Sequence, residues 1–128
     1  PAGVNNLRLG TAILLGIASS IGPQKIPGFE QDTFEVECEL NEVKRRGRRI
    51  GLLSMGHTDA DPGYLFPLEP GVKVLKAFSD HTLVDLEEAG PSLAAGDCLH
   101  FQLGYFALTK LMHSPWVEHI YLANDDHA

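Results

Sequence analysis

Regular alternation of apolar and polar residues is the clearest pattern along this chain. From Asp32 to Val43, apolar side chains occupy positions 34, 36, 38 and 40, while glutamates occupy positions 35, 37 and 39. Successive side chains of an extended chain point to opposite faces, so we predict a half-buried strand here. Arg49–Met55 is a second apolar run after the basic turn Lys44–Arg49, and we expect the two runs to pair as a hairpin.

Four further segments have the pattern of short strands separated by turn residues. They are Gly71–Phe78, His81–Glu87, Asp97–Leu103 and Trp116–Leu122, with a turn at 89–96. In Tyr105–Met112 the spacing of apolar residues fits a short helix or a broken strand. Six or seven short strands at even spacing predict a mainly β fold, a small barrel or sandwich with one short helix.

The first 20 residues do not follow this pattern. Leu7–Leu9 is strand-like, and Gly10-Thr11 then leads into an apolar turn of helix. Backbone N–H groups at such a helix start can bind an anion, although a glycine in this place more often just makes a turn. Ala18–Gly28 is rich in Pro, Ser and Gly. We therefore expect a strand–helix unit at 1–20, a linker at 21–31 and a β-domain at 32–128.

Composition and charge exclude some classes of function. The chain has 128 residues, enough for one domain with its own core, and contains no apolar run approaching the length of about 20 that spans a bilayer. Its net charge of −7 argues against nucleic acid as a partner. We interpret the one basic run, Lys44–Arg49, as a solvated hairpin tip rather than an RNA- or anion-binding loop.

The two cysteines, Cys38 and Cys98, both fall inside apolar alternations. We expect buried free thiols of a cytoplasmic protein rather than a disulfide framework. The chain starts Pro1-Ala2-Gly3, without Met or a signal-peptide pattern, as a fragment or a processed product would.

Two polar clusters carry the candidate chemistry. His57, Asp59 and Asp61 stand at alternate positions, so they share one face of an extended chain. Ser79-Asp80-His81 is a second cluster between two predicted strands. Three interpretations are open: aspartates that cap turns, a histidine that carries protons, or a metal site of histidine and carboxylate ligands.

Three stretches taken together resemble a known family. They are NLRLGTAILLG from Asn6, GHTDADPGYLFPLEPGVKVLKAFSDH within Ile50–Leu86, and LGYFALTKLMHSPWVEHIY over Leu103–Tyr121. In this order they resemble fold-type III pyridoxal-phosphate (PLP) amino acid racemases, and most of all the ornithine racemase-like branch of the alanine racemase family. The resemblance implies a C-terminal fragment, made of the last strand and helix of a (β/α)8 barrel followed by the family's β-domain.

The resemblance assigns the cofactor contacts to four positions. Arg8 matches the arginine that contacts the pyridine nitrogen of PLP, which limits the electron sink and favours simple racemisation. Gly10 and Thr11 match positions whose backbone N–H groups hold the cofactor phosphate. Tyr105 matches a tyrosine whose hydroxyl contacts that phosphate.

The resemblance also implies which residues act on the amino acid substrate. His57 falls where alanine racemases carry a tyrosine, the second base, which reaches into the active site of the partner subunit. This replacement is a departure from the family, although a histidine is also able to move a proton. Ser79 and Asp80 fall near a loop that lines the substrate pocket of the neighbouring subunit in the family. From charge alone, we add the hypothesis that Asp59, Asp61 or Asp80 binds a distal ammonium of a diamino acid substrate.

The catalytic lysine of the family is missing from this sequence. That lysine holds PLP as a Schiff base near the start of the barrel domain, and none of the lysines here stands in its motif. We therefore expect this chain to complete the active site of a homodimer together with the N-terminal barrel domain of the same protein, and to be inactive alone. Two alternatives stay open: a metal-assisted lyase of the D-threonine aldolase or D-serine dehydratase type with ligands at His57, Asp59 and His81, or a non-enzymatic β-barrel binding module.

Overall fold

Six antiparallel strands make up most of the regular secondary structure. A computed structural model of the chain describes residues 3–6, 10–18 and 24–122. In chain order the elements are α1 (Thr11–Leu15), β1 (Glu35–Arg46), β2 (Arg48–Leu53), the 3-10 turn η1 (Pro62–Tyr64), β3 (Leu65–Pro67), β4 (Lys73–Ala77), β5 (Thr82–Asp85), β6 (Cys98–Leu103) and α2 (Tyr105–Leu111).

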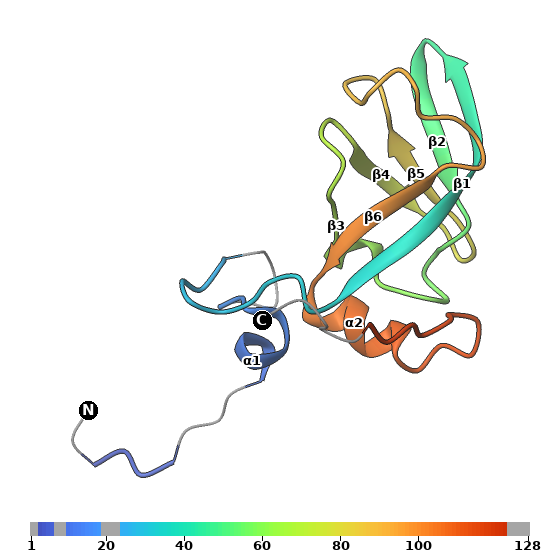
Figure 1. Cartoon of the computed structure of the whole chain (residues 1–128). Helices are drawn as coiled ribbons and strands as arrows, with labels where there is room; N and C mark the ends of the chain where they lie inside the picture. Colours follow the sequence, from blue (N-terminus) through green and yellow to red (C-terminus); the bar gives the residue numbers. More distant parts are fainter. Residues whose placement is uncertain (1–2, 7–9, 19–23, 123–128) are drawn as a thin grey trace.

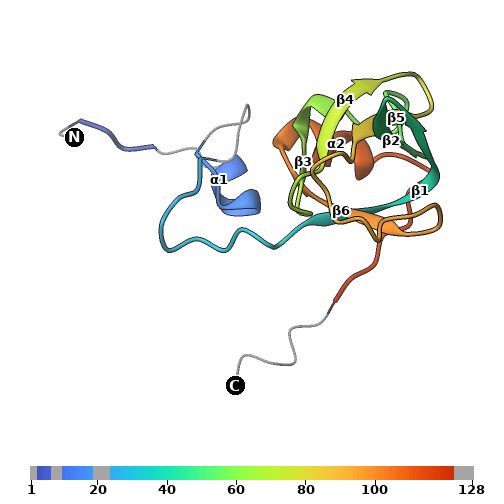
Figure 2. The same cartoon turned by 90° about the horizontal axis from the view of Figure 1, so that it is seen from above.

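The strands close into a nearly complete barrel, so the predicted mainly β fold is confirmed. Their order in the sheet is β3-β6-β1-β2-β5-β4, and they follow one another around a ring when the molecule is seen from above (Figure 2). The β1–β2 tip projects from one end of the barrel, and α2 lies across the other end (Figure 1). The barrel therefore has a basic end and a helix-capped end.

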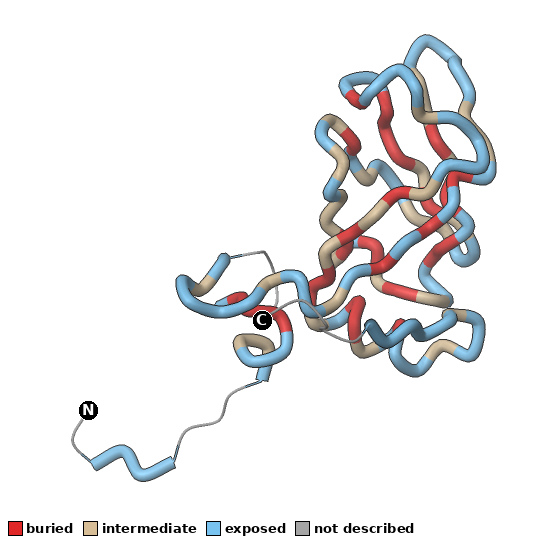
Figure 3. The backbone as a smooth tube through the Cα atoms, viewed as in Figure 1, coloured by how far each residue is buried: buried red, intermediate tan, exposed pale blue. Residues whose placement is uncertain are grey.

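Alternation along β1 builds one wall of the core as predicted. Val36, Cys38 and Leu40 are buried, while the glutamates between them are exposed (Figure 3). Opposite β1, Leu53 of β2 and Leu99 and Phe101 of β6 are completely buried. The long strand β1 pairs with both β2 and β6, so the inward side chains of three strands meet in one apolar interior.

Helix α2 closes one end of the barrel, which settles the choice between helix and broken strand for Tyr105–Met112. Its side chains Ala107, Leu108 and Leu111 are buried in the core. The helix starts after Gly104, where an added Cβ would stand 3.0 Å from the Tyr64 ring. A glycine at this position lets the helix pack closely against η1.

One predicted strand is absent from the structure, and one strand was not predicted. Trp116–Leu122 forms no strand: Trp116, Ile120, Tyr121 and Leu122 are exposed, and the Trp116 amide donates to the Ser114 hydroxyl in a turn. An apolar run becomes a strand only where an open sheet edge receives its hydrogen bonds. Conversely, the short strand β3 was not predicted, because its sequence stands among prolines that break the alternation.

The segment before the barrel forms a short helix and a loop that doubles back. Helix α1 ends at Gly16, whose φ of 62° and close approach to the Glu30 carbonyl leave no room for a side chain. Ile17 is buried and pairs with Lys25 in an isolated bridge. The predicted strand Leu7–Leu9 lies outside the described residues. None of the helices in the described ranges is long and apolar enough to cross a membrane.

The basic tip of the β1–β2 hairpin is held by acceptors of the barrel itself. Arg45 and Arg48 pair with Glu87 (3.2 Å) and Asp85 (3.0 Å). The Arg49 guanidinium donates to four backbone carbonyls of the loop after β5, those of Leu86, Gly90, Pro91 and Leu93. The hairpin predicted from the basic run is confirmed, and its cations serve to fix a neighbouring loop.

We expect the change Arg49→Met to lower the free energy of unfolding by about 2 kcal/mol, because hydrogen bonds to a charged group contribute more than neutral ones. Arg46→Met is the matched control, since Arg46 is an exposed arginine of the same tip with no ion pair among the described residues. Urea denaturation of both variants measures the difference. Equal losses in the two variants would show that the Arg49 contacts add nothing to stability.

A histidine–glutamate pair ties the turn after β3 to β6. Glu69 Oε1 accepts from the His100 amide (2.9 Å) and lies 2.8 Å from His100 Nδ1. The hydrogen bond to Glu69 raises the pKa of His100, and Glu35 and Glu37 on the same outer face of the barrel add to this effect. Protonated His100 is therefore favoured in the folded state.

This pair predicts a pH dependence of stability. The folded pKa of His100 is raised above its ordinary value of 6.5, so the stabilisation is complete below that pH and disappears as the pH rises through the folded pKa. The effect is small because the imidazole is partly exposed. Thermal melts between about pH 6 and 8.5 should show the decline in the wild type and a flatter profile in Glu69→Gln. Parallel profiles would contradict this origin.

Candidate functional site

The two polar clusters singled out in the sequence lie side by side at the α2 end of the barrel. The His57 amide donates to the Phe78 carbonyl, and the Thr58 amide to the Ser79 carbonyl, both at 2.8 Å. The Thr58 hydroxyl also donates to the Ser79 carbonyl at 2.8 Å. The loop after β2 and the turn between β4 and β5 are thus fixed to each other through their backbones.

Gly56 makes this close contact between the two loops achievable. A Cβ on Gly56 would stand 2.5 Å from the backbone nitrogen of His81 and 2.6 Å from the carbonyl oxygens of Phe78 and Ser79. Real Cβ atoms do not approach backbone atoms this closely, so only glycine fits. The Gly56 carbonyl accepts from the Asp59 and Ala60 amides, which folds 56–60 into a tight turn.

Asp59 and Asp61 cap turns, so this interpretation of the first cluster is confirmed. Asp59 Oδ2 accepts from the Gly56 amide at 3.2 Å and from the Thr58 hydroxyl at 3.3 Å. Asp61 Oδ1 accepts from the Gly63 amide at 3.2 Å and is the N-cap of η1. Both carboxylates have a structural task, whatever further role they take.

Asp80 differs from these two aspartates because it faces solvent. Its side chain is 79% exposed, and its Oδ1 lies 2.8 Å from Nδ1 of His81. This hydrogen bond lowers the pKa of the Asp80 carboxyl, so the group stays ionised at neutral pH. The His81 ring stacks on Phe78 with ring centres 4.5 Å apart, which fixes the imidazole beside the carboxylate.

The structure does not assemble a metal site from these clusters. Among residues 3–6, 10–18 and 24–122, no group of three or more His, Cys, Asp or Glu side chains is arranged to hold a metal ion. His57, Asp59 and His81 therefore do not converge as the ligand set of the lyase alternative.

Neither cysteine is set up as a nucleophile. Both are free thiols, as predicted, but only Cys38 is buried, and Cys98 is partly exposed. Burial raises the pKa of Cys38, and Glu37 beside Cys98 raises the pKa of that thiol to about 11. Both thiols are therefore protonated at neutral pH, and only a thiolate reacts as a nucleophile.

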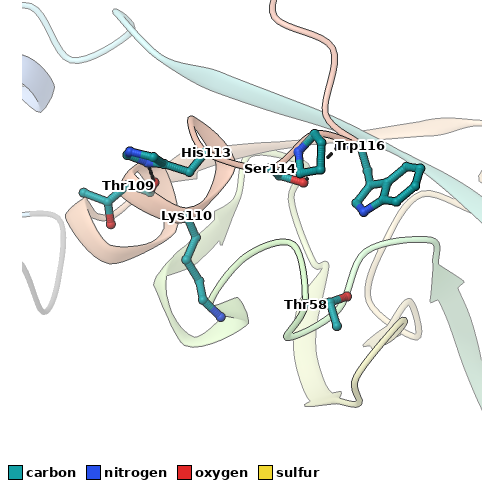
Figure 4. A pocket seen from close by; sticks show the side chains of 7 residues that line it. Thr58, Thr109, Lys110, His113, Ser114 and Trp116 are labelled. Atoms are coloured by element: carbon teal, nitrogen blue, oxygen red, sulfur yellow. Dashed lines mark hydrogen bonds between the residues drawn. The ribbon is translucent and has the colours of Figure 1, made fainter.

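His57 is exposed, and its backbone is held by helix α2 as well as by the β4–β5 turn. Lys110 Nζ donates to the His57 carbonyl oxygen at 2.6 Å. Lys110 also borders an open pocket of about 420 Å³ whose wall includes Thr58, Ser114 and Trp116 (Figure 4). This contact could not be predicted from the sequence, because the two residues are far apart in the chain and an exposed lysine on a helix carries no signal of its partner.

The residues matched to cofactor contacts lie in two places. Tyr105 is the first residue of α2 and is half-buried, and its hydroxyl has no hydrogen-bond partner within the described ranges. Gly10 and Thr11 stand at the start of α1, outside the barrel in both views (Figures 1 and 2), and no side chain caps that helix start. Arg8 lies outside the described residues. The donors assigned to a phosphate group thus have no competing partner of their own where the structure describes them.

Comparison with known proteins agrees with the resemblance drawn from the sequence. The chain is 30% identical to an ornithine racemase of Acetoanaerobium sticklandii over 92% of its length, and 33% identical to a lysine racemase of Thermotoga maritima over 94%. It spans only 40% of the length of each relative. No family model matches the chain, and no solved structure matches it. The predicted resemblance to racemases of the ornithine racemase-like branch is confirmed.

Proposed function

We propose that this chain is the C-terminal part of a PLP-dependent amino acid racemase and completes the active site of a homodimer. The observation that carries the proposal is the similarity to two racemases along nearly the whole chain. In this assignment residues 1–20 end the cofactor-binding barrel, 21–31 link the two domains and 32–128 form the β-domain. The exposed apolar side chains of 116–122 offer a surface for the remaining domain or the partner subunit.

Two sets of hydrogen-bond donors support the proposal that this chain binds the phosphate end of the cofactor. Among the described residues, no side chain caps the start of α1 at Thr11, and the half-buried Tyr105 hydroxyl has no hydrogen-bond partner. In this proposal Gly10, Thr11 and Tyr105 hold the phosphate, and Arg8 contacts the pyridine nitrogen. When bound, PLP supplies an electron-accepting ring that stabilises negative charge at the substrate Cα.

The proton transfers define the role proposed for His57. Racemisation removes the Cα proton on one face of the substrate and returns a proton on the other, so it needs an acid/base group on each face. His57 stands on an exposed turn fixed by backbone hydrogen bonds and serves one face, in the site of the partner subunit. In this proposal a lysine of the barrel domain, which also holds PLP, serves the other face.

The aspartates of the two loops give the site its preference for a diamino acid. Asp80 is the strongest candidate to bind a distal ammonium, because it is ionised and exposed, and Ser79 lies next to it. Asp59 and Asp61 already accept backbone amides, so they support the pocket chiefly by shaping its wall. We therefore propose a substrate like ornithine or lysine, because the Asp80 carboxylate is negatively charged and the two relatives are an ornithine racemase and a lysine racemase.

A chimera tests the proposal directly. The chain replaces the matching segment of the Acetoanaerobium sticklandii ornithine racemase, and PLP absorbance and the optical rotation of ornithine, lysine and alanine are followed. We expect racemisation of a diamino acid by the chimera and none by the 128-residue chain alone.

A folded, PLP-loaded chimera that racemises no amino acid would overturn the proposal. If the fusion does not fold, the chain is mixed with the separately expressed remainder of that racemase. Failure of the folded pieces to bind each other and to restore activity would favour the non-enzymatic binding module.

A further inference from the structure

Both peptide groups that flank the His57 Cα are held in place. The peptide before His57 donates its N–H to the Phe78 carbonyl. The peptide after His57 donates the Thr58 N–H to Ser79 and accepts the Lys110 ammonium at 2.6 Å. Two fixed peptide planes fix the direction of the Cα–Cβ bond between them, and with it the position from which the imidazole reaches outward.

Two of these contacts are made with the β4–β5 turn, and the third, from Lys110, comes from α2. Without Lys110 the His57 carbonyl would have no hydrogen-bond partner among the described residues, and this peptide would be held only through the Thr58 amide. The helix is a firm base for this contact, because the neighbouring Leu108 and Leu111 are buried in the core. A short, charge-assisted hydrogen bond from such a base holds geometry better than a neutral one.

We propose that Lys110 is a positioning residue for His57: its ammonium fixes the His57 peptide and thereby the imidazole that transfers the proton. The catalytic part of this inference rests on the proposed function of His57. The geometric part is independent of that function, since it concerns only how firmly the 56–60 turn is held. Small displacements of a reacting group cost rate steeply, so loss of this contact lowers kcat rather than substrate binding.

The geometric part is tested by NMR on the full 128-residue chain. In Lys110→Met, the Thr58 amide and the His57 ring signals should shift and broaden, and amide exchange at Thr58 should speed up by about tenfold. Lys110→Arg, which keeps a cationic donor, should restore the wild-type signals. Lys73→Met is the matched control, because Lys73 pairs with Glu88 at 2.7 Å in β4, away from His57.

The catalytic part is tested in the racemase chimera. We expect Lys110→Met to lower kcat by about tenfold with KM within a factor of about two, Lys110→Arg to recover most of the loss, and Lys73→Met to behave as wild type. Unchanged His57 and Thr58 signals in Lys110→Met would overturn the inference and leave the proposed function standing. An inactive wild-type chimera would instead count against the proposed function, and the NMR result would still decide the geometry.

Discussion

His57→Ala is expected to lower kcat for racemisation by about two to four orders of magnitude, the usual contribution of a general acid or base. Because inversion needs a proton carrier on each face of the substrate, loss of one carrier slows the reaction in both directions. The assay is performed in the racemase chimera with both enantiomers of ornithine. His57→Tyr, which restores the residue type that the alanine racemases carry, should recover a large part of the activity.

Deuterium exchange separates this role from a general loss of structure. In heavy water the His57→Ala chimera should still exchange the Cα proton of one enantiomer with retention, while inversion nearly stops. Lys73→Met is again the control, because Lys73 pairs with Glu88 at 2.7 Å in β4 and takes no part in the proposed site. If exchange and inversion fall together in His57→Ala, His57 does not act as the base of one face.

Gly56→Ala is expected to lower the free energy of unfolding by about 2–3 kcal/mol, in the range of an overpacked site. The new methyl group would overlap backbone atoms of Phe78, Ser79 and His81, which cannot move aside like a flexible side chain. The two loops must therefore separate, and the hydrogen bonds from His57 and Thr58 weaken. Urea denaturation of the chain and the amide spectrum of residues 56–60 and 78–81 measure both effects.

Gly63→Ala is the matched control for this substitution. Gly63 lies in the same connection, but an added Cβ there would meet only the flexible Asp61 carboxylate, at 3.4 Å. Its expected cost is well below 1 kcal/mol. Similar losses in the two variants would mean that the loops tolerate the methyl group at Gly56.

The parts of the fold that follow from local pattern were predictable. Alternation around Val36 and Leu40 placed β1 and its buried face, and the turn signal Asp61-Pro62-Gly63 anticipated the cap of η1. The Trp116–Leu122 strand failed because periodicity measures only how apolar a segment is. Whether a sheet edge is free to receive it depends on the pairing of all other strands, which no local window contains.

The site was predictable only in outline, for a similar reason. The sequence marked His57 and Ser79–His81 as polar clusters, and the structure brings their loops together. Two contacts could not be predicted: the hydrogen bonds from Arg49 to the loop after β5, and the hydrogen bond from Lys110 to the His57 carbonyl. Both join residues that are far apart in the chain. An exposed lysine or arginine carries no periodic signal, so its partner appears only when the fold is known.

The pairing of β1 with both its neighbour and a distant strand has a consequence for folding kinetics. The β1–β2 and β4–β5 hairpins are local, whereas Glu39 pairs with Cys98 and Glu35 with Gln102, at the far end of the barrel sequence. Such high contact order predicts slow refolding, limited by the arrival of β6. Because α2 directly follows β6, the ammonium that steadies His57 is also among the last groups to reach its place. In a folding intermediate with both hairpins formed and β6 detached, the 56–60 turn would still pack against the β4–β5 turn. The His57 peptide would lack its hydrogen bond from Lys110, so the imidazole would not yet be held in position.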